Sequence, residues 1–275
     1  MTSRFTRMFP HAVTAAAAAV VVLILFVPGA IAHDSAVPAP PAQPTSADQI
    51  QNIDQVKTAI KAYYGDTLTS TLDPVNGTVQ LHTFSPSGAY ANEMAGIESD
   101  AATYLDKAAK HEKKFSGTPA VLFDIDDTTL NTYSYEIYSN FVFNPTTNAA
   151  FVNNAVFPAT PGMPALVSHA RDDGYTVFFL TGRPEAQRAG TVTNLQNAGY
   201  GTEDKDHLYL KDLTAPWLAS CAPNCPTTTY KSLTRQHIES LGYDIVANFG
   251  DQFSDLNGGF ADQTFKIPNP MYFLP

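Results

Sequence analysis

Three carboxylates follow a short apolar run near the middle of the chain. Residues 120–123 read as a buried strand, and Asp124, Asp126 and Asp127 come directly after it. Because side chains alternate along an extended strand, Asp124 and Asp126 leave it on the same side. Two carboxylates this close repel each other unless a cation lies between them or one of them keeps a proton. The stretch therefore predicts a reactive site, and a strand end capped by solvated acids is the alternative.

Four further polar side chains stand where other predicted strands end or helices begin. They are, in chain order, Thr181, Lys231, Asp251 and Asp255. In an α/β sheet the carboxyl ends of the strands open onto one crevice, so these groups would meet the first carboxylates there. Carboxylate and carbonyl oxygens suit a hard cation such as Mg²⁺, and a lysine with a hydroxyl can bind the remaining oxygens of a phosphate. This composition predicts a phosphoryl-transfer site that takes a small phosphorylated molecule.

The elements that must position these groups alternate along the chain. Strands are predicted over 120–123, 175–180, 208–210 and 243–249, with helices between them. Such alternation predicts the α/β class, with a mainly parallel central sheet covered by helices on both faces, a Rossmann-like three-layer sandwich. We therefore expect residues 46–275 to form a single domain.

Two additions to this domain are predicted. Residues 46–118 would form an N-terminal helical extension, with one helix from a capping box at Ser46 and Gln49 to Gly65 and another over 87–110. Residues 131–158 follow the first carboxylates and are rich in aromatic side chains. They would form a small lid over the site, or serve packing alone, and the sequence leaves both open.

The first residues have the features of a signal peptide. Residues 1–32 contain two arginines, an apolar core and the small residues Ala30 and Ala32, which predicts cleavage after Ala32 and export. Cleavage leaves 243 of the 275 residues and, because two arginines and no acids are removed, lowers the formal charge from −10 to −12. Residues 33–45 form a spacer rich in proline and alanine.

The composition narrows the partners of the mature protein. An acidic surface repels polyanions, which argues against a nucleic acid polymer as partner, and no later segment is apolar enough to span a membrane. The two cysteines, Cys221 and Cys225, most simply close a short loop as a disulfide in an exported protein. The oligomeric state is not predicted.

The quoted stretches resemble, in order, the four motifs of the haloacid dehalogenase (HAD) superfamily of phosphatases. The motifs are Asp124–Thr128, Leu180–Arg183, Lys231 and Gly250–Asp255. The nearer resemblance is to its acid phosphatase branch, subfamily IIIB, which includes the bacterial class B and class C enzymes and the plant vegetative-storage-type acid phosphatases. It extends from about residue 87 to the end of the chain.

The resemblance implies a role for each matching residue. Asp124 would be the nucleophile that forms an aspartyl-phosphate, and Asp126 would be the general acid and then the general base. Thr181 and Lys231 would bind the phosphoryl oxygens. Mg²⁺ would be held by Asp124, by the backbone carbonyl of Asp126 and by Asp251.

Several supporting roles are less specific. Asp255 would act through a bound water or by orienting Lys231. Lys211 is the alternative to Lys231 for the lysine that binds the phosphoryl group. Arg183 would reach substrate or form a structural salt bridge. Thr128 would hydrogen-bond to the backbone of its loop.

The expected function is a secreted, Mg²⁺-dependent acid phosphatase that hydrolyses phosphate monoesters. A secreted binding or storage protein with trivial turnover is one alternative. A phosphotransferase, which moves the phosphoryl group to an alcohol other than water, is another.

Overall fold

A computed structural model describes residues 45–46, 49, 52–110, 115–201 and 206–274. The predicted signal peptide and nearly all of the proline-rich spacer lie outside these residues. By its internal contacts the chain divides into two units, Met1–Ile50 and Gln51–Pro275, and the helices and strands of the described residues belong to the second. Among the described residues, no helix combines the length and the apolar character needed to cross a bilayer.

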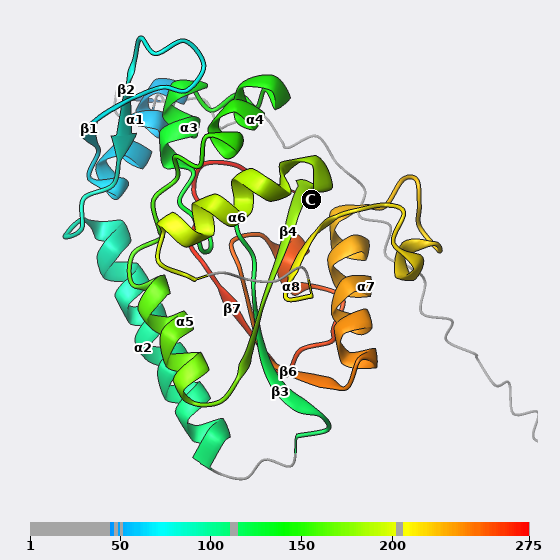
Figure 1. Ribbon diagram of the computed structural model, residues 1–275. Coiled ribbons are helices and arrows are strands. Elements are labelled where there is room, and N and C mark those ends of the chain that lie inside the picture. Colours follow the sequence, from blue (N-terminus) through cyan, green and yellow to red (C-terminus); the bar gives the residue numbers. More distant parts are fainter. Residues whose placement is uncertain (1–44, 47–48, 50–51, 111–114, 202–205, 275) are drawn as a thin grey trace, which may run out of the picture. The chain divides into compact units, whose positions relative to one another are not determined.

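A five-stranded sheet forms the centre of the second unit (Figure 1). In spatial order its strands are β5 (Leu208–Lys211), β4 (Thr176–Pro184), β3 (Thr118–Phe123), β6 (Tyr243–Gly250) and β7 (Gln263–Lys266). Every neighbouring pair is parallel, so all carboxyl ends lie at one edge of the sheet. The predicted α/β class with a mainly parallel sheet is confirmed, and β7 is a strand that the sequence pattern missed.

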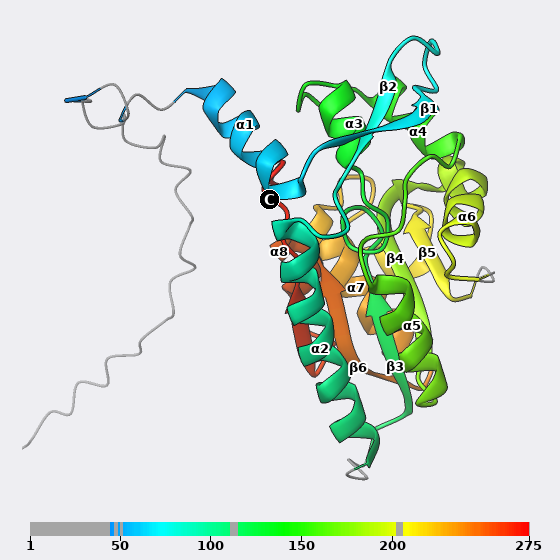
Figure 2. The same ribbon diagram turned by 90° about the vertical axis from the view of Figure 1, so that its left-hand side faces the viewer.

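Helices cover both faces of the sheet (Figure 2). On one face, α2 (Ala89–Lys110), α5 (Met163–Asp172) and α6 (Arg188–Asn197) share a core with Val121 and Phe123 of β3. On the other face, α7 (Thr227–Ser240) packs with Ala120 and Leu122 of the same strand. This division follows the period of two along a strand, which sends successive side chains to opposite faces. The three-layer arrangement places the ends of β3, β4 and β6 between two apolar layers.

The sequence predicts a helical N-terminal extension, but the structure places two strands there as well as helices. After α1 (Ile53–Tyr64) the chain forms an antiparallel hairpin of β1 (Thr67–Leu72) and β2 (Gln80–Thr83). The connecting turn is held by the Asp73 carboxylate, which accepts backbone N–H groups between residues 75 and 79. An Asn76-Gly77 pair in this turn is a hairpin signal.

The start of α1 also differs from the prediction. Asn52 caps the helix, because its side-chain oxygen accepts the Gln55 amide at 2.9 Å. Of the predicted capping box, the described residues show that Ser46 O accepts the Gln49 backbone N–H at 3.2 Å, and the helix predicted to follow directly falls partly outside them. The end is as predicted, since Gly65 adopts the left-handed conformation with φ 65° that favours glycine.

The aromatic insert forms two short helices, α3 (Tyr133–Tyr138) and α4 (Pro145–Asn153). Four of its aromatic side chains are buried: Tyr133, Tyr135, Phe151 and Phe157. Tyr133 stacks on Tyr64 of α1 with ring centroids 4.4 Å apart. Together with the hairpin, α3 and α4 lie beyond the carboxyl ends of the central strands in both views (Figures 1 and 2). Tyr133 therefore packs the insert against the extension, while Tyr135, Phe151 and Phe157 pack against one another within the insert. A lid function stays a prediction.

Short elements complete the C-terminal half. They are the 3-10 turns η2 (Glu185–Gln187) and η3 (Pro216–Leu218) and the helix α8 (Phe253–Leu256). Cys221 and Cys225 are joined in the predicted disulfide, in the connection between β5 and α7.

Candidate active site

Asp124 stands immediately beyond β3 and forms an ion pair with Lys231 of α7. Its backbone N–H extends the sheet ladder by donating to Phe249 at 2.9 Å, and its carboxylate is buried. The Lys231 ammonium contacts Asp124 Oδ1 and also donates to Leu180 O at 2.9 Å. Because the same ammonium lies 2.9 Å from Asp255 Oδ1, Lys231 joins the ends of β3, β4 and β6.

Burial and charge act against each other at this ion pair. Burial raises the pKa of the Asp124 carboxyl well above its ordinary value, the Lys231 ammonium opposes this, and the neighbouring carboxylates reinforce it. Burial alone would lower the pKa of Lys231, but the charges of Asp124 and Asp255 outweigh it and the net shift is upward. A charged lysine is therefore fixed beside the predicted nucleophile.

Asp126 is the more accessible carboxylate and has its own cationic partner. Its side chain is 30% exposed, and the Arg183 guanidinium donates to it from both Nε, at 3.0 Å, and Nη2, at 2.7 Å. The hydroxyl of Thr181 lies 3.4 Å from Asp126 Oδ2. The two carboxylates that the sequence predicts as a pair are thus balanced separately, Asp124 by Lys231 and Asp126 by Arg183.

Asp251 completes an acidic cluster with Asp124 and Asp255. One carboxylate oxygen from each of the three lies within 4.8 Å of the others, and all three residues are buried. Burial raises the pKa of Asp251 well above its ordinary value, and Asp255 and Asp127 add to this. Three carboxylates face a single lysine, so the fully ionised cluster carries two uncompensated negative charges. This oxygen-only, anionic donor set fits a divalent cation such as Mg²⁺.

The contacts of Asp255 and Lys211 bear on two alternatives that the sequence left open. Asp255 contacts Lys231 through Oδ1, while its Oδ2 accepts the Gln252 backbone N–H at 2.9 Å, so it is placed to orient the lysine. Lys211 instead donates to the carbonyl of Cys225 at 3.0 Å. Lys231 is therefore the lysine at the acidic cluster.

The prediction for Thr128 is wrong. Its hydroxyl is buried and has no hydrogen-bond partner among the described residues. The neighbouring Thr129 makes the expected backbone contacts, with its hydroxyl 3.1 Å from Asp124 O and 3.3 Å from Ile125 O. The sharp turn at Asp127, where φ is 56°, places Thr129 rather than Thr128 back over the end of the strand.

Asp127 belongs to this site, although no separate role was predicted for it. It is fully buried, accepts the Thr132 backbone N–H at 2.9 Å, and accepts the Tyr272 hydroxyl at 2.8 Å. Burial raises its pKa to about 7. Its partner Tyr272 lies in the last residues of the chain, which no motif marked as part of the site.

Comparisons with known proteins agree with the fold and with the motifs. Residues 77–275 match the family model described as HAD superfamily, subfamily IIIB (Acid phosphatase). Acid phosphatase 1 of Solanum lycopersicum is 36% identical over 177 residues, which cover 62% of this chain and 66% of that protein. Vegetative storage protein 2 of Arabidopsis thaliana is 30% identical over 158 residues, or 56% of each protein.

A solved structure shares the fold. The class C acid phosphatase from Bacillus anthracis superposes with a TM-score of 0.53 at 23% identity, covering 66% of this chain and 80% of that chain. The matched regions leave a third or more of the length of the two plant relatives uncovered. Because the family model spans most of the sequence and its motifs meet at one site, the chain belongs to the acid phosphatases of HAD superfamily subfamily IIIB.

Proposed function

We propose that the protein is an exported, Mg²⁺-dependent acid phosphatase that hydrolyses small phosphate monoesters through an aspartyl-phosphate. Membership of an acid phosphatase family supports phosphomonoesterase activity. The observation that carries the mechanism is the buried cluster of Asp124, Lys231, Asp251 and Asp255, with the more exposed Asp126 beside it. It combines a nucleophile, a cation for phosphoryl oxygens and a set of oxygen ligands.

The two carboxylates after β3 would divide the chemistry. In the first step Asp124 attacks phosphorus in line, a P–O bond to the carboxylate forms, and the P–O bond to the leaving alcohol breaks as Asp126 gives that alcohol a proton. In the second step Asp126 takes a proton from water, which attacks the phosphorus and releases phosphate and Asp124. Since Asp126 must begin protonated while Asp124 is ionised, we expect activity to favour mildly acidic pH.

Thr181 and Lys231 would bind the phosphoryl oxygens, one by a hydroxyl and the other by a full charge. Thr181 accepts the backbone N–H of Arg183 at 3.1 Å, which orients its hydroxyl toward Asp126. Arg183 is buried and also donates to Thr191 at 3.0 Å, so its contacts favour the structural salt bridge over a direct role on substrate.

The metal would be held by Asp124, by the backbone carbonyl of Asp126 and by Asp251. Bound there, Mg²⁺ supplies positive charge that offsets the repulsion between the phosphate and the carboxylates. The contacts of Asp255 favour its orienting role toward Lys231.

Hydrolysis of p-nitrophenyl phosphate by the purified mature protein tests the proposal. We expect turnover that is highest at acidic pH, disappears with EDTA, and returns with Mg²⁺. Asp124→Asn should lower kcat by at least about 10³-fold because the nucleophile is lost. Asp100→Asn, on the exposed side of α2, is the matched control and should leave kcat unchanged. Full activity in Asp124→Asn would refute the aspartyl-phosphate.

A storage or binding protein is the second candidate, because two relatives are named vegetative storage proteins. It predicts negligible turnover in the wild type and retained phosphate-ester binding in Asp124→Asn. A phosphotransferase would instead give new phosphate esters when alcohol acceptors are added. Export is tested separately by measuring the mass of the protein in the medium. We expect the mature protein found there to begin at His33.

A further inference from the structure

We propose that Asn269 is a positioning residue for Asp251, and that the last segment of the chain thereby completes the acidic cluster. This inference rests on the proposed function, in which Asp251 is a ligand of Mg²⁺. Asn269 Nδ2 donates to Asp251 Oδ2 at 2.6 Å, across 18 positions of sequence. No motif marks this residue, and its contact with the cluster exists only in the folded chain.

Two neutral amides hold the same oxygen of Asp251. Gln252 Nε2 donates to Oδ2 at 2.7 Å, beside the bond from Asn269. Among the described residues these are the side-chain donors to Asp251, and neither reaches Oδ1. The carboxylate is thus oriented through one oxygen, which leaves the other for a cation.

The neutrality of these donors matters for metal binding. Asp124 is paired with a lysine, so its charge is already partly compensated. Asn269 and Gln252 orient Asp251 without adding positive charge, and the carboxylate keeps its full attraction for a divalent ion. Amide or carbonyl groups behind a ligand are the usual way in which proteins fix a metal-binding side chain.

The amide of Asn269 is itself fixed. Its oxygen accepts the backbone N–H of Met271 at 2.8 Å. An amide oxygen can accept this bond and an amide nitrogen cannot, so the NH₂ group must face Asp251.

The backbone around Asn269 is also restrained. Pro268 and Pro270 flank it, which fixes φ on both sides and keeps Asn269 extended. Ile267, fully buried, continues the pairing of β7 by donating its N–H to Gly250 O at 2.9 Å. The residue is therefore carried on a rigid segment anchored beside β6, where a positioning group needs to be.

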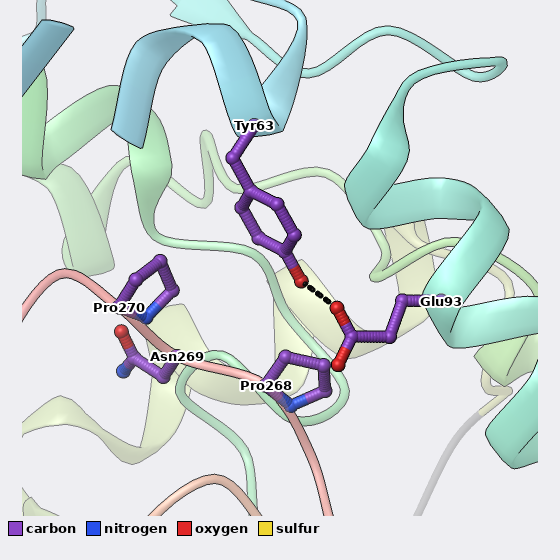
Figure 3. A pocket seen from close by; sticks show the side chains of 5 residues that line it. All are labelled: Tyr63, Glu93, Pro268, Asn269 and Pro270. Carbon is purple, nitrogen blue, oxygen red and sulfur yellow. Dashed lines mark hydrogen bonds between the residues drawn. The ribbon is translucent and has the colours of Figure 1, made fainter. Parts of the chain in front are cut away.

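Asn269, which contacts Asp251, also lines a surface pocket of about 320 Å³ (Figure 3). The pocket is lined by Tyr63, Glu93, Pro268, Asn269 and Pro270, and the Tyr63 hydroxyl donates to Glu93 at 2.6 Å. Shortening Asn269 would remove its hydrogen bond to Asp251 and also change the wall of the pocket. The test therefore needs a variant that fills the same space as well as one that does not.

The test measures Mg²⁺ binding without turnover. The wild type, Asn269→Leu and Asn269→Ala are heated in EDTA and in rising Mg²⁺, and the concentration giving half of the maximal rise in Tm is recorded. We expect this midpoint to increase about 10- to 100-fold in both variants. The Mg²⁺ concentration needed for half-maximal hydrolysis should increase by the same factor, while kcat at saturating Mg²⁺ recovers. Asn76→Ala, which removes an exposed amide from the hairpin turn, is the control and should keep the wild-type midpoint.

The outcomes separate this inference from the proposed function. If Asn269 served only the fold, both variants would lower Tm equally in EDTA and in Mg²⁺ and keep the wild-type midpoint, which would overturn the inference alone. Failure of both variants to fold would likewise assign Asn269 to the fold and overturn it. A wild type whose Tm does not respond to Mg²⁺ would overturn the metal proposal and this inference together.

Discussion

At the scale of single residues, the two carboxylates that follow β3 have different cationic partners. Lys231 compensates Asp124, and Arg183 compensates Asp126. Removing one member of a buried pair leaves an unpaired charge and typically costs about 3–5 kcal/mol. The remaining hydrogen bonds around the nucleophile come from neutral groups, among which the Thr129 hydroxyl contacts the backbone of Asp124 itself.

The adjacent threonines of this loop provide a matched pair of variants. Thr129→Val removes a buried hydrogen bond to the backbone and should lower the free energy of unfolding by about 1–2 kcal/mol. Thr128→Val removes a buried hydroxyl that has no partner among the described residues, so stability should be unchanged or higher. Urea unfolding of the two variants beside the wild type measures both effects. An equal loss in both would contradict the assignment of the backbone contacts to Thr129.

At the scale of elements, a buried arginine connects α7 to the loop after α8. The Arg235 guanidinium has no exposed surface and donates to three backbone carbonyls, those of Gly259, Asp255 and Asn257. Burial lowers its pKa to about 10. Because Lys231 lies one turn earlier on α7 and Asp255 lies in α8, this arginine fixes the two elements whose side chains meet at the cluster.

Replacing this arginine tests the connection between α7 and α8. Lysine keeps the charge but cannot span three carbonyls, so Arg235→Lys leaves buried acceptors unpaired at about 1–3 kcal/mol each. We expect a loss of stability of at least about 2 kcal/mol and a lower kcat, since Asp255 would no longer be held against Lys231. Arg188→Lys, at an ion pair with the partly exposed Glu185, is the comparison and should cost less than about 1 kcal/mol. Similar losses in the two variants would show that Arg235 has no special role.

At the scale of the whole molecule, the protein buries more acidic groups than it neutralises. Burial raises the pKa of both Glu98 and Glu136 to about 7. Glu98, on α2, lies against the start of α5, where a Cβ on Gly162 would overlap its carboxylate. One of its oxygens is buried without a hydrogen-bond partner among the described residues. Because these buried carboxyls resist ionisation and the chain already has a formal charge of −10, we expect the protein to be more stable at acidic than at neutral pH.

The pH dependence of stability follows from the sign of these shifts. Below about pH 4.5, the ordinary pKa of Glu98, the carboxyl is protonated in both the folded and the unfolded chain. Between that pH and about 7 the folded state binds the proton more tightly, so the free energy of unfolding falls as pH rises. Above about 7 the folded protein must hold the ionised carboxylate, and the stabilisation is gone.

A neutral replacement isolates the contribution of Glu98. Glu98→Gln should reduce the loss of stability between pH 5 and pH 8, by an amount on the order of 1 kcal/mol because the side chain is only half-buried. Asp100→Asn removes a charge from the exposed side of the same helix and is the control. Guanidinium unfolding at the two pH values measures the difference. A slope in Glu98→Gln equal to that of the wild type would refute this source of the pH dependence.

The sequence by itself determined the class of fold, and it predicted the residues proposed for the chemistry. Strand periodicity predicts β3, β4 and β6. The polar residues predicted at the ends of these strands are Asp124, Thr181 and Asp251. Such local signals suffice because a strand fixes where its next side chains point, and because parallel strands end at one edge of the sheet. The hairpin and β7 were missed, since both consist of short and largely exposed strands with little hydrophobic pattern.

Only the tertiary structure decided which groups face one another. In it, Asp124 and Asp126 form separate ion pairs, and Asp255 contacts Lys231. The backbone contact expected of the Thr128 hydroxyl is made by the Thr129 hydroxyl. The tertiary structure also carried Asn269 and Tyr272 from the end of the chain to carboxylates far from them in sequence. Hydrogen bonds and ion pairs depend on ångström distances between segments whose separation along the chain carries no information about their contact, so spacing and composition cannot reveal them.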